Sequence, residues 1–443
     1  MDNPAGAPLI SPAMMTLLPV AFLRRLLTGA TLIVLSTAAP ALEPRTWISL
    51  DGRTIDAELI KTEGDLVELK DKDNRTLKVP KSSLSFGDLD YIAEYAPEEK
   101  KLGFAKATAK AKLPNPAKEM KFVSKTVKKD AGQLKVGETL FKYAETPHFK
   151  IFYSKGVDPG DTAELAERLW HDTAFFHASF AGKFKDRRLA VFMADEALDF
   201  VKLGAWYVEI LVAAGNTVHA AAVSKIWSKL GASSIALPVE TAATQGLFPN
   251  ATVIRMVGRG SPEGTGDNAK GVWGSFRTHV LAGDLMELQA GGVAGFATQG
   301  QFAIFTGHSY FKEIDLTGAS VTGVFNKDTS KESTASGGYD TGRNWAGELK
   351  NRLRKKDVKL NLSVLFASSI DDAKADDLAL AYSFSRFLQS TPERHTAYGK
   401  LLERINTSNQ VPDPDALAKI YDLADGAALE KEWRGYVESG DFR

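Results

Sequence analysis

The chain has 443 residues, which predicts two or three domains at about 150 residues each, and its 55 lysine and arginine residues balance 55 aspartate and glutamate residues. A formal net charge of zero argues against a general electrostatic attraction to nucleic acid or anionic lipid, because both attract surplus cations. The lack of cysteine excludes disulfides, thiolate metal sites and a cysteine nucleophile, and no two of the seven histidines stand four apart, which excludes a helical His-x-x-x-His metal pair.

The first 41 residues have the features of a secretory signal peptide. An arginine pair precedes an apolar stretch at 26–41, which ends with the small residues Ala39 and Ala41. A basic flank, an apolar run and small residues before the cleavage site are the three parts of such a signal, so we expect cleavage after Ala41. The mature protein would then be secreted or periplasmic, without a membrane span. A retained anchor, a buried helix and a start at Met14 or Met15 are the open alternatives.

Residues 43–97 alternate apolar and polar positions in short runs. Turns are expected at Asp51-Gly52, at 63–65 and at Asp73-Asn74, which separates the runs by roughly ten residues. This spacing predicts a small antiparallel barrel, followed by a short helix at 87–95.

Positions spread along this segment resemble a known family. They are Trp47, 51–54, Ala57, Val67, Leu69-Lys70, Val79-Pro80, Leu84-Ser85, Asp88 and Tyr91-Ile92. The segment resembles the first Sla-type homology domain, which implies an SH3-like barrel. In eukaryotic adaptors that family binds short Asn-Pro-Phe peptides, and related copies occur at the front of exported bacterial proteins. We therefore expect a protein or peptide partner at the barrel, with Trp47 and Tyr91 as candidate contacts; the alternative is a structural cap with Trp47 in its core.

Residues 98–135 predict a flexible basic linker. The window 98–130 has ten lysines against four acidic residues, and Pro114 and Pro116 prevent a continuous helix. Its surplus charge suits an acidic cell-envelope polymer or a lipid headgroup, although a solvated spacer is the simpler interpretation.

Residues 140–443 predict an α+β domain with a helical C-terminal part. Strands are expected at 146–154 and 189–194, with a helix between them that Asp161 caps. The stretch 221–260 is expected to be rich in strands, and a loop is expected at 328–343. Helices are expected at 206–214, 272–288, 346–355, 376–389, 394–405, 413–423 and 427–438.

Dispersed motifs in this part also resemble a family. They are the strand 146–154, the stretches 362–366 and 381–388, and Leu429-Glu430 before Trp433. Together with the order of elements they are similar to the exported gluzincin-like peptidases of the peptidase-MA-like group. The resemblance implies a zincin-like α+β fold, in which a helix carrying His-Glu-x-x-His and a glutamate from a later stretch hold zinc.

The counterpart of the zinc-binding helix is 275–283, where most of the required groups are missing. His279 stands at the position of the first ligand, Val280 at that of the general base and Gly283 at that of the second ligand. Ala294 stands at the position of the third ligand. The resemblance therefore implies a degenerate site, and we expect no metal, cofactor or catalytic residue, because one imidazole cannot hold a catalytic zinc.

The sequence thus favours an exported, non-catalytic envelope protein that binds a protein, peptide or glycan in the inherited cleft or through the barrel. One rival is a hydrolase with a non-standard site formed by His279, Asp284 and Glu287. A second rival is a structural envelope component. A cell-envelope polymer is a further candidate partner, and nucleic acid is not expected.

Overall fold

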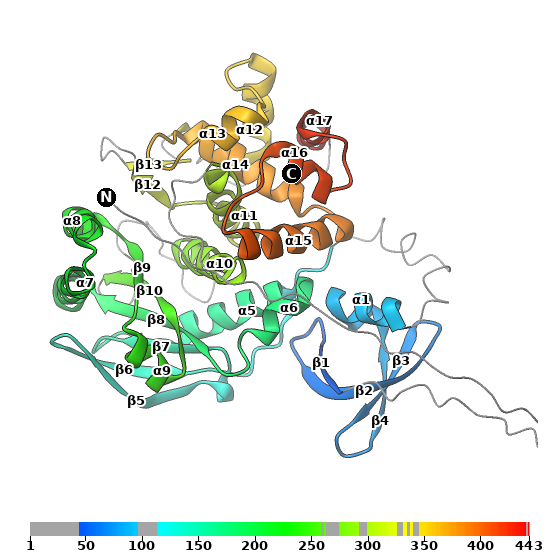
Figure 1. Cartoon of the computed structure of the whole chain (residues 1–443), viewed down its shortest axis with the longest axis horizontal. Helices are drawn as coiled ribbons and strands as arrows, with labels where there is room; N and C mark the ends of the chain where they lie inside the picture. The colour runs from blue at the N-terminus through cyan, green and yellow to red at the C-terminus, as the bar shows by residue number, and fades with distance from the viewer. Residues whose placement is uncertain are drawn as a thin grey trace, which may run out of the picture. The chain divides into compact units, whose positions relative to one another are not determined.

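The computed structural model describes residues 44–95, 113–257, 261–262, 274–291, 299–325, 331–334, 337–339, 345–439 and 442. The predicted signal peptide and its cleavage site lie outside these residues. The described residues belong to one compact unit, Leu42–Arg443. They form an N-terminal antiparallel sheet, a mixed α/β middle and a helical C-terminal part (Figure 1). Within this described part, no helix combines the length and apolar character needed to cross a membrane.

The N-terminal sheet is antiparallel, and its strands follow one another in chain order. Its elements are β1 (Arg45–Ile48), β2 (Thr54–Glu63), β3 (Leu66–Asp71), β4 (Thr76–Pro80), a 3₁₀ turn (Lys81–Ser83) and α1 (Phe86–Tyr95). Gly52 and Gly64 have φ of 87° and 58° in the turns between strands, a region that favours glycine. The alternating residues Trp47, Val67 and Leu69 fill the core under the sheet. The short strands and the following helix are therefore confirmed.

This sheet shares apolar packing with the rest of the unit. Ile48 belongs to the same buried cluster as residues of helix α5 (Gly160–Phe176). The Leu50 carbonyl oxygen lies 3.0 Å from Nε2 of His171 on α5, and the Phe86 ring packs edge-on against Phe176 with centroids 5.1 Å apart. The N-terminal sheet is thus attached through side-chain contacts in addition to its covalent connection.

Residues 113–135 are structured, so the prediction of a flexible linker at 98–135 was wrong over this part. Helix α4 (Pro116–Glu119) begins with Asn115, whose side chain accepts a hydrogen bond from the Lys118 amide at 3.1 Å. Ala117 is fully buried, and strand β5 (Lys128–Val136) joins the large sheet. The composition indicated a linker because this segment has few large apolar side chains to bury. Strand β5 forms nevertheless, because pairing in a sheet uses backbone groups. Residues 98–112 lie outside the described residues.

The large sheet is mixed, with the order β11-β10-β8-β7-β6-β5, and β9 pairs with β10. Strands β7, β8 and β10 run parallel, and the others pair antiparallel. The bounds are β6 (Thr139–Glu145), β7 (Phe149–Tyr153), β8 (Arg188–Asp195), β9 (Ala232–Ala236), β10 (Leu247–Val257) and β11 (Ser261–Pro262).

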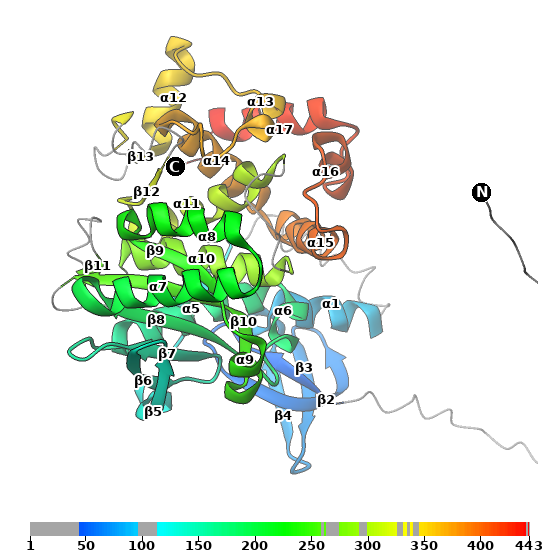
Figure 2. The same cartoon turned by 60° about the vertical axis from the view of Figure 1, so that its left-hand side comes forward.

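Helices cover both faces of this sheet, which explains why β7 is buried at every position. Ile151 and Val191 pack with α5 and α10 on one face, whereas Phe152 and Phe192 pack with α7 and α8 on the other (Figure 2). The covering elements are α6 (Ala178–Gly182), a π-helix (Glu196–Phe200), α7 (Val201–Ala213), α8 (Thr217–Ile226), a 3₁₀ turn (Trp227–Lys229), α9 (Val239–Gln245) and α10 (Ser275–Gln289). The strand-rich prediction for 221–260 was therefore only partly right, and Asp161 lies in the first turn of α5 without capping it.

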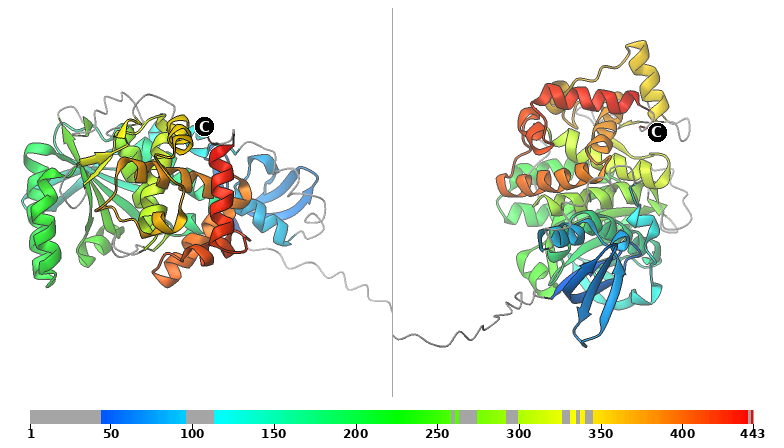
Figure 3. Two further views of the ribbon diagram at one scale, coloured as in Figure 1. Left: turned by 90° about the horizontal axis from the view of Figure 1, so that it is seen from above. Right: turned by 90° about the vertical axis from the view of Figure 1, so that its right-hand side faces the viewer.

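The C-terminal part is helical (Figure 3), and most residues of its helix α14 (Ala375–Leu388) are buried. Its elements are a π-helix (Phe302–Thr306), α11 (Gly307–Thr317), β12 (Gly323–Phe325), β13 (Lys331–Ser333), α12 (Trp345–Lys355), α13 (Leu362–Ala367), α14 (Ala375–Leu388), α15 (Pro392–Ser408), α16 (Pro414–Ile420) and α17 (Gly426–Glu438). The helices predicted from 346 onward are confirmed, whereas α11 was not predicted. Nearly every position of α11 is buried, so it shows little of the polar–apolar period that identifies a surface helix.

Candidate functional site

Helix α10 presents candidate residues in two directions. His279 and Gly283 are one turn apart and both face α11. Asp284 and Glu287 lie on another side of α10 and line a cavity beside β10. The structure therefore places Asp284 and Glu287, but not His279, in the lining of this cavity, although the charge of His279 still acts on Asp284.

The imidazole of His279 pairs with a carboxylate that the sequence analysis did not single out. Its Nδ1 lies 2.9 Å from Oε2 of Glu313 on α11, and its ring meets the Tyr310 ring edge-on with centroids 4.6 Å apart. The His279 side chain is 13% exposed, whereas that of Glu313 is 0% exposed. A signal was present in the sequence, because Lys312, Glu313 and Asp315 are three charged residues inside an otherwise largely apolar stretch at 302–316.

The carboxylate of Glu313 is saturated with hydrogen bonds. Its Oε1 accepts from the Ser275 hydroxyl, from the Val321 amide at 2.9 Å, and from the amide and hydroxyl of Thr322 at 3.3 and 3.0 Å. A buried carboxylate is tolerated only when such donors replace water. Glu313 thus ties the start of α10 to the segment that follows α11.

Close packing of α10 on α11 restricts position 283. A Cβ atom built on Gly283 would lie 2.6 Å from the Ser309 hydroxyl, so a side chain at position 283 requires the Ser309 side chain to move. Val280 is partly buried and packs on the apolar core beneath the sheet, and Ala294 lies outside the described residues. Among the residues that the structure describes, no three histidine, aspartate or glutamate side chains are grouped to hold a metal ion.

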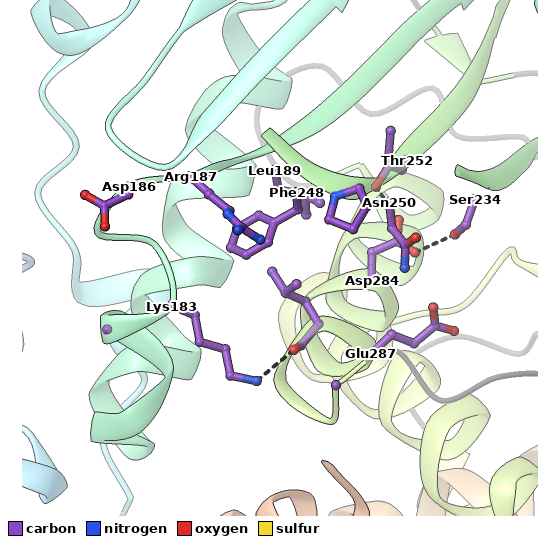
Figure 4. A pocket seen from close by; sticks show the side chains of 15 residues that line it. Lys183, Asp186, Arg187, Leu189, Ser234, Phe248, Asn250, Thr252, Asp284 and Glu287 are labelled. Atoms are coloured by element: carbon purple, nitrogen blue, oxygen red, sulfur yellow. Dashed lines mark hydrogen bonds between the residues drawn. The ribbon is translucent and has the colours of Figure 1, made fainter. Parts of the chain in front are cut away.

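The cavity beside α10 has a volume of about 410 Å³ (Figure 4). Its walls come from the second half of α10, the first residues of β8 and β10, strand β9, and the turn after α6. Its polar lining includes Lys183, Arg187, Ser234, Asn250, Thr252, Asp284 and Glu287. The cavity therefore combines acidic, basic, amide and hydroxyl groups.

Two of the carboxyl groups that line the cavity, those of Asp284 and Glu287, differ in protonation. Asp284 accepts hydrogen bonds from the hydroxyls of Ser234, at 3.0 Å, and Thr252, yet burial raises its pKa to about 6. Burial and the negative charge of Asp284 raise the pKa of Glu287 to about 8. Near pH 7, Asp284 is thus mostly an acceptor, while Glu287 retains a proton that it can donate to a ligand.

The basic side of the cavity is anchored to the end of α10. Nζ of Lys183 donates to the carbonyl oxygens of Leu288 and Gln289 at 3.1 and 2.8 Å, and burial lowers the pKa of this amine. Cations at the end of a helix bind its unpaired carbonyl groups. Lys183 therefore fixes the cavity wall on which Glu287 lies.

The candidate contacts of the N-terminal sheet lie mainly in its core. Trp47 is 1% exposed, and its Nε1 donates to the Ala57 carbonyl at 2.9 Å. Its ring meets that of half-buried Tyr91 edge-on at 5.8 Å, and the Arg45 guanidinium lies 4.3 Å from the Tyr91 ring. Trp47 is therefore a core residue in this structure, which agrees with the alternative interpretation of a structural cap.

A comparison with protein-family models gave no match, and comparisons with curated proteins and with solved structures gave none either.

Proposed function

We propose that this chain is an exported, non-catalytic binding protein of the cell envelope, built on a gluzincin-like scaffold with a degenerate zinc site. The packing of α10 on α11 supports this scaffold, because His279 faces Glu313 and Gly283 faces Ser309, one turn apart on each helix. In the family that the chain resembles, these are the places where two imidazoles and a glutamate from a later helix meet. Glu313, instead of Ala294, is then the counterpart of the third ligand.

The contacts of these residues support binding over metal-dependent hydrolysis. Glycine and valine replace the second imidazole and the general base. Both oxygens of Glu313 are already hydrogen bonded, Oε2 to His279 and Oε1 to neighbouring hydroxyl and amide groups. One imidazole and one carboxylate are fewer protein ligands than the three that a catalytic zinc site uses.

The observation that carries the proposal is the cavity that holds Asp284 and Glu287 beside the outer strand β9. No other described strand pairs with the free side of β9, so an extended peptide can add to it through backbone hydrogen bonds. Ser234 of β9 lines the cavity, and a side chain of such a peptide would enter it at this point. The acid of Glu287, the carboxylate of Asp284 and the guanidinium of Arg187 suit a polar side chain or backbone amide.

Peptide selection tests this proposal. Phage-displayed peptides of about eight residues are selected on the purified protein, and their affinities are measured by calorimetry. We expect Asp284→Ala to lower the affinity of the selected peptides about tenfold, because it removes an acceptor and so leaves a donor of the peptide unpaired. Glu240→Ala, an exposed change on α9, serves as the control. Equal affinity in Asp284→Ala would contradict the site, and binding of soluble peptidoglycan fragments alone would favour a glycan ligand.

The protonation of Glu287 predicts a pH dependence of the same binding. Between about pH 7 and pH 9 a carboxyl group with a pKa of about 8 loses its proton, so its donor is replaced by a negative charge. We expect wild-type affinity to fall several-fold over this range. Glu287→Gln keeps a donor at every pH, and its affinity is expected to stay nearly constant. A fall of the same size in Glu287→Gln would exclude Glu287 as the group responsible.

A hydrolase is the second candidate, and one observation favours it. A carboxylate at Nδ1 orients an imidazole so that Nε2 can act as a base, and His279 has such a carboxylate in Glu313. Fluorogenic peptides and p-nitrophenyl esters test it with wild type and His279→Gln. Turnover that His279→Gln abolishes would establish the hydrolase and contradict a purely binding role.

A further inference from the structure

A second cavity, of about 790 Å³, lies between α12 and α17 in the helical part of the chain. It shares no lining residue with the cavity beside α10. Five basic side chains line it, with one acidic side chain, Glu438: they are Lys350, Arg354, Lys356, Lys359 and Arg434. We propose that this cavity is a binding site for a phosphate-bearing ligand.

Three of these cations have charge available for a ligand. Arg354, Lys356 and Lys359 are exposed and have no ion-pair partner among the described residues. The other two hold the walls: Nζ of Lys350 donates to the Ser439 carbonyl at 2.7 Å. Arg434 donates to the Leu360 carbonyl at 3.0 Å and pairs with Glu430 at 3.2 Å. The charge of Arg434 is therefore partly neutralised by Glu430, whereas the charges of Arg354, Lys356 and Lys359 suit an external anion.

The backbone after α12 brings these cations together. Lys356 has φ of 64°, a left-handed conformation that costs residues other than glycine roughly 1 kcal/mol. Hydrogen bonds from the Lys356 amide to Leu353 and from the Asp357 amide to Arg352, at 3.1 and 3.0 Å, maintain this turn. This turn reverses the direction of the chain after α12. Lys359, which follows the turn, therefore lines the same cavity as Arg354, which lies in the last turn of α12.

The chemistry of the lining favours phosphate over a single carboxylate. A phosphate ester has up to two negative charges and several acceptor oxygens, which several cations can share. The chain as a whole has no net charge, so this concentration of cations is local. Val358, Leu360 and Val437 give the cavity an apolar part of its lining, which suits the organic part of the ligand. A phospholipid headgroup and a soluble phosphate ester share this chemistry.

Two probes distinguish these sources. Flotation with phosphatidylcholine vesicles, with and without about 20% phosphatidylglycerol, measures binding to a headgroup, and NMR titration with glycerol phosphate measures binding of a soluble ester. The test variant is Lys356→Glu/Lys359→Glu. The matched control is Lys72→Glu/Lys125→Glu, which makes the same change of charge at exposed positions elsewhere.

We expect the test variant to weaken binding of at least one probe by about tenfold or more, while the control retains wild-type binding. Binding of phosphatidylglycerol vesicles alone would identify a lipid headgroup, and binding of glycerol phosphate would identify a soluble ester. Three results would overturn the site: no binding of either probe, equal binding by the test variant, or an equal loss in the control. Circular dichroism of both variants checks that the fold is kept.

Discussion

Replacement of Glu313 by alanine is expected to lower the free energy of unfolding by about 3 to 5 kcal/mol. The side chain is 0% exposed, and its Oε1 is the acceptor for two backbone amides and two hydroxyls. When the carboxylate is removed, these four donors and Nδ1 of His279 lose their hydrogen-bond partner while they remain inside the protein. Urea denaturation, followed by circular dichroism, measures the effect.

Two further variants make this result specific. Glu313→Gln should lose much less stability, because its amide oxygen still accepts from Thr322 and its amide nitrogen can donate to the other tautomer of His279. Glu240→Ala removes an exposed carboxylate from α9 and should change stability by less than about 0.5 kcal/mol. A loss below about 1 kcal/mol in Glu313→Ala would show that water or a rearranged loop replaces the carboxylate.

Acidification is expected to destabilise the folded chain through His177. This histidine is buried with His308 and His395, and its ring centroid lies 6.2 Å from that of His395. Burial, followed by the positive charge of Lys312, lowers the pKa of His177 to about 4. Burial and Lys312 also lower the pKa values of His308 and His395. Protonation of these imidazoles therefore favours the unfolded chain.

The direction of the pH effect follows from proton binding. Below the ordinary histidine pKa of about 6.5, His177 binds a proton in the unfolded chain. In the folded chain His177 binds this proton only near pH 4. The contribution of His177 is thus complete above about pH 6.5 and is lost as the pH falls to about 4, a difference of about 3 kcal/mol. About 2 kcal/mol of it should be gone at pH 5.

The readout is a difference between variants, because other groups oppose this effect. Asp284 and Glu287 have raised pKa values, so they take up protons in the folded chain as the pH falls and stabilise it. Unfolding is therefore measured near pH 7.5 and pH 5 for wild type, His177→Gln and His219→Gln, an exposed control on α8. We expect His177→Gln to lose less stability on acidification than the other two. An identical change in all three would rule out His177.

Local patterns predicted many elements of the fold. The alternation between Trp47 and Val79 predicted the antiparallel strands of the N-terminal sheet, and the period of apolar residues after 346 predicted the helices there. The patterns failed where side chains are buried on all sides, as in α11, or where backbone pairing decides, as in β5. In both cases the stabilising contacts come from distant segments.

For the candidate site, the residue pattern was enough to exclude a helical metal pair of histidines and to predict that His279, Asp284 and Glu287 lie on one helix. What each of these side chains faces depends on the packing of distant segments. His279 meets Glu313 because α11 packs on α10, 34 residues later in the chain, and Glu287 gains its high pKa because the cavity beside β10 withdraws it from water. Helical period is a local property, whereas pairing and desolvation depend on which segments pack together.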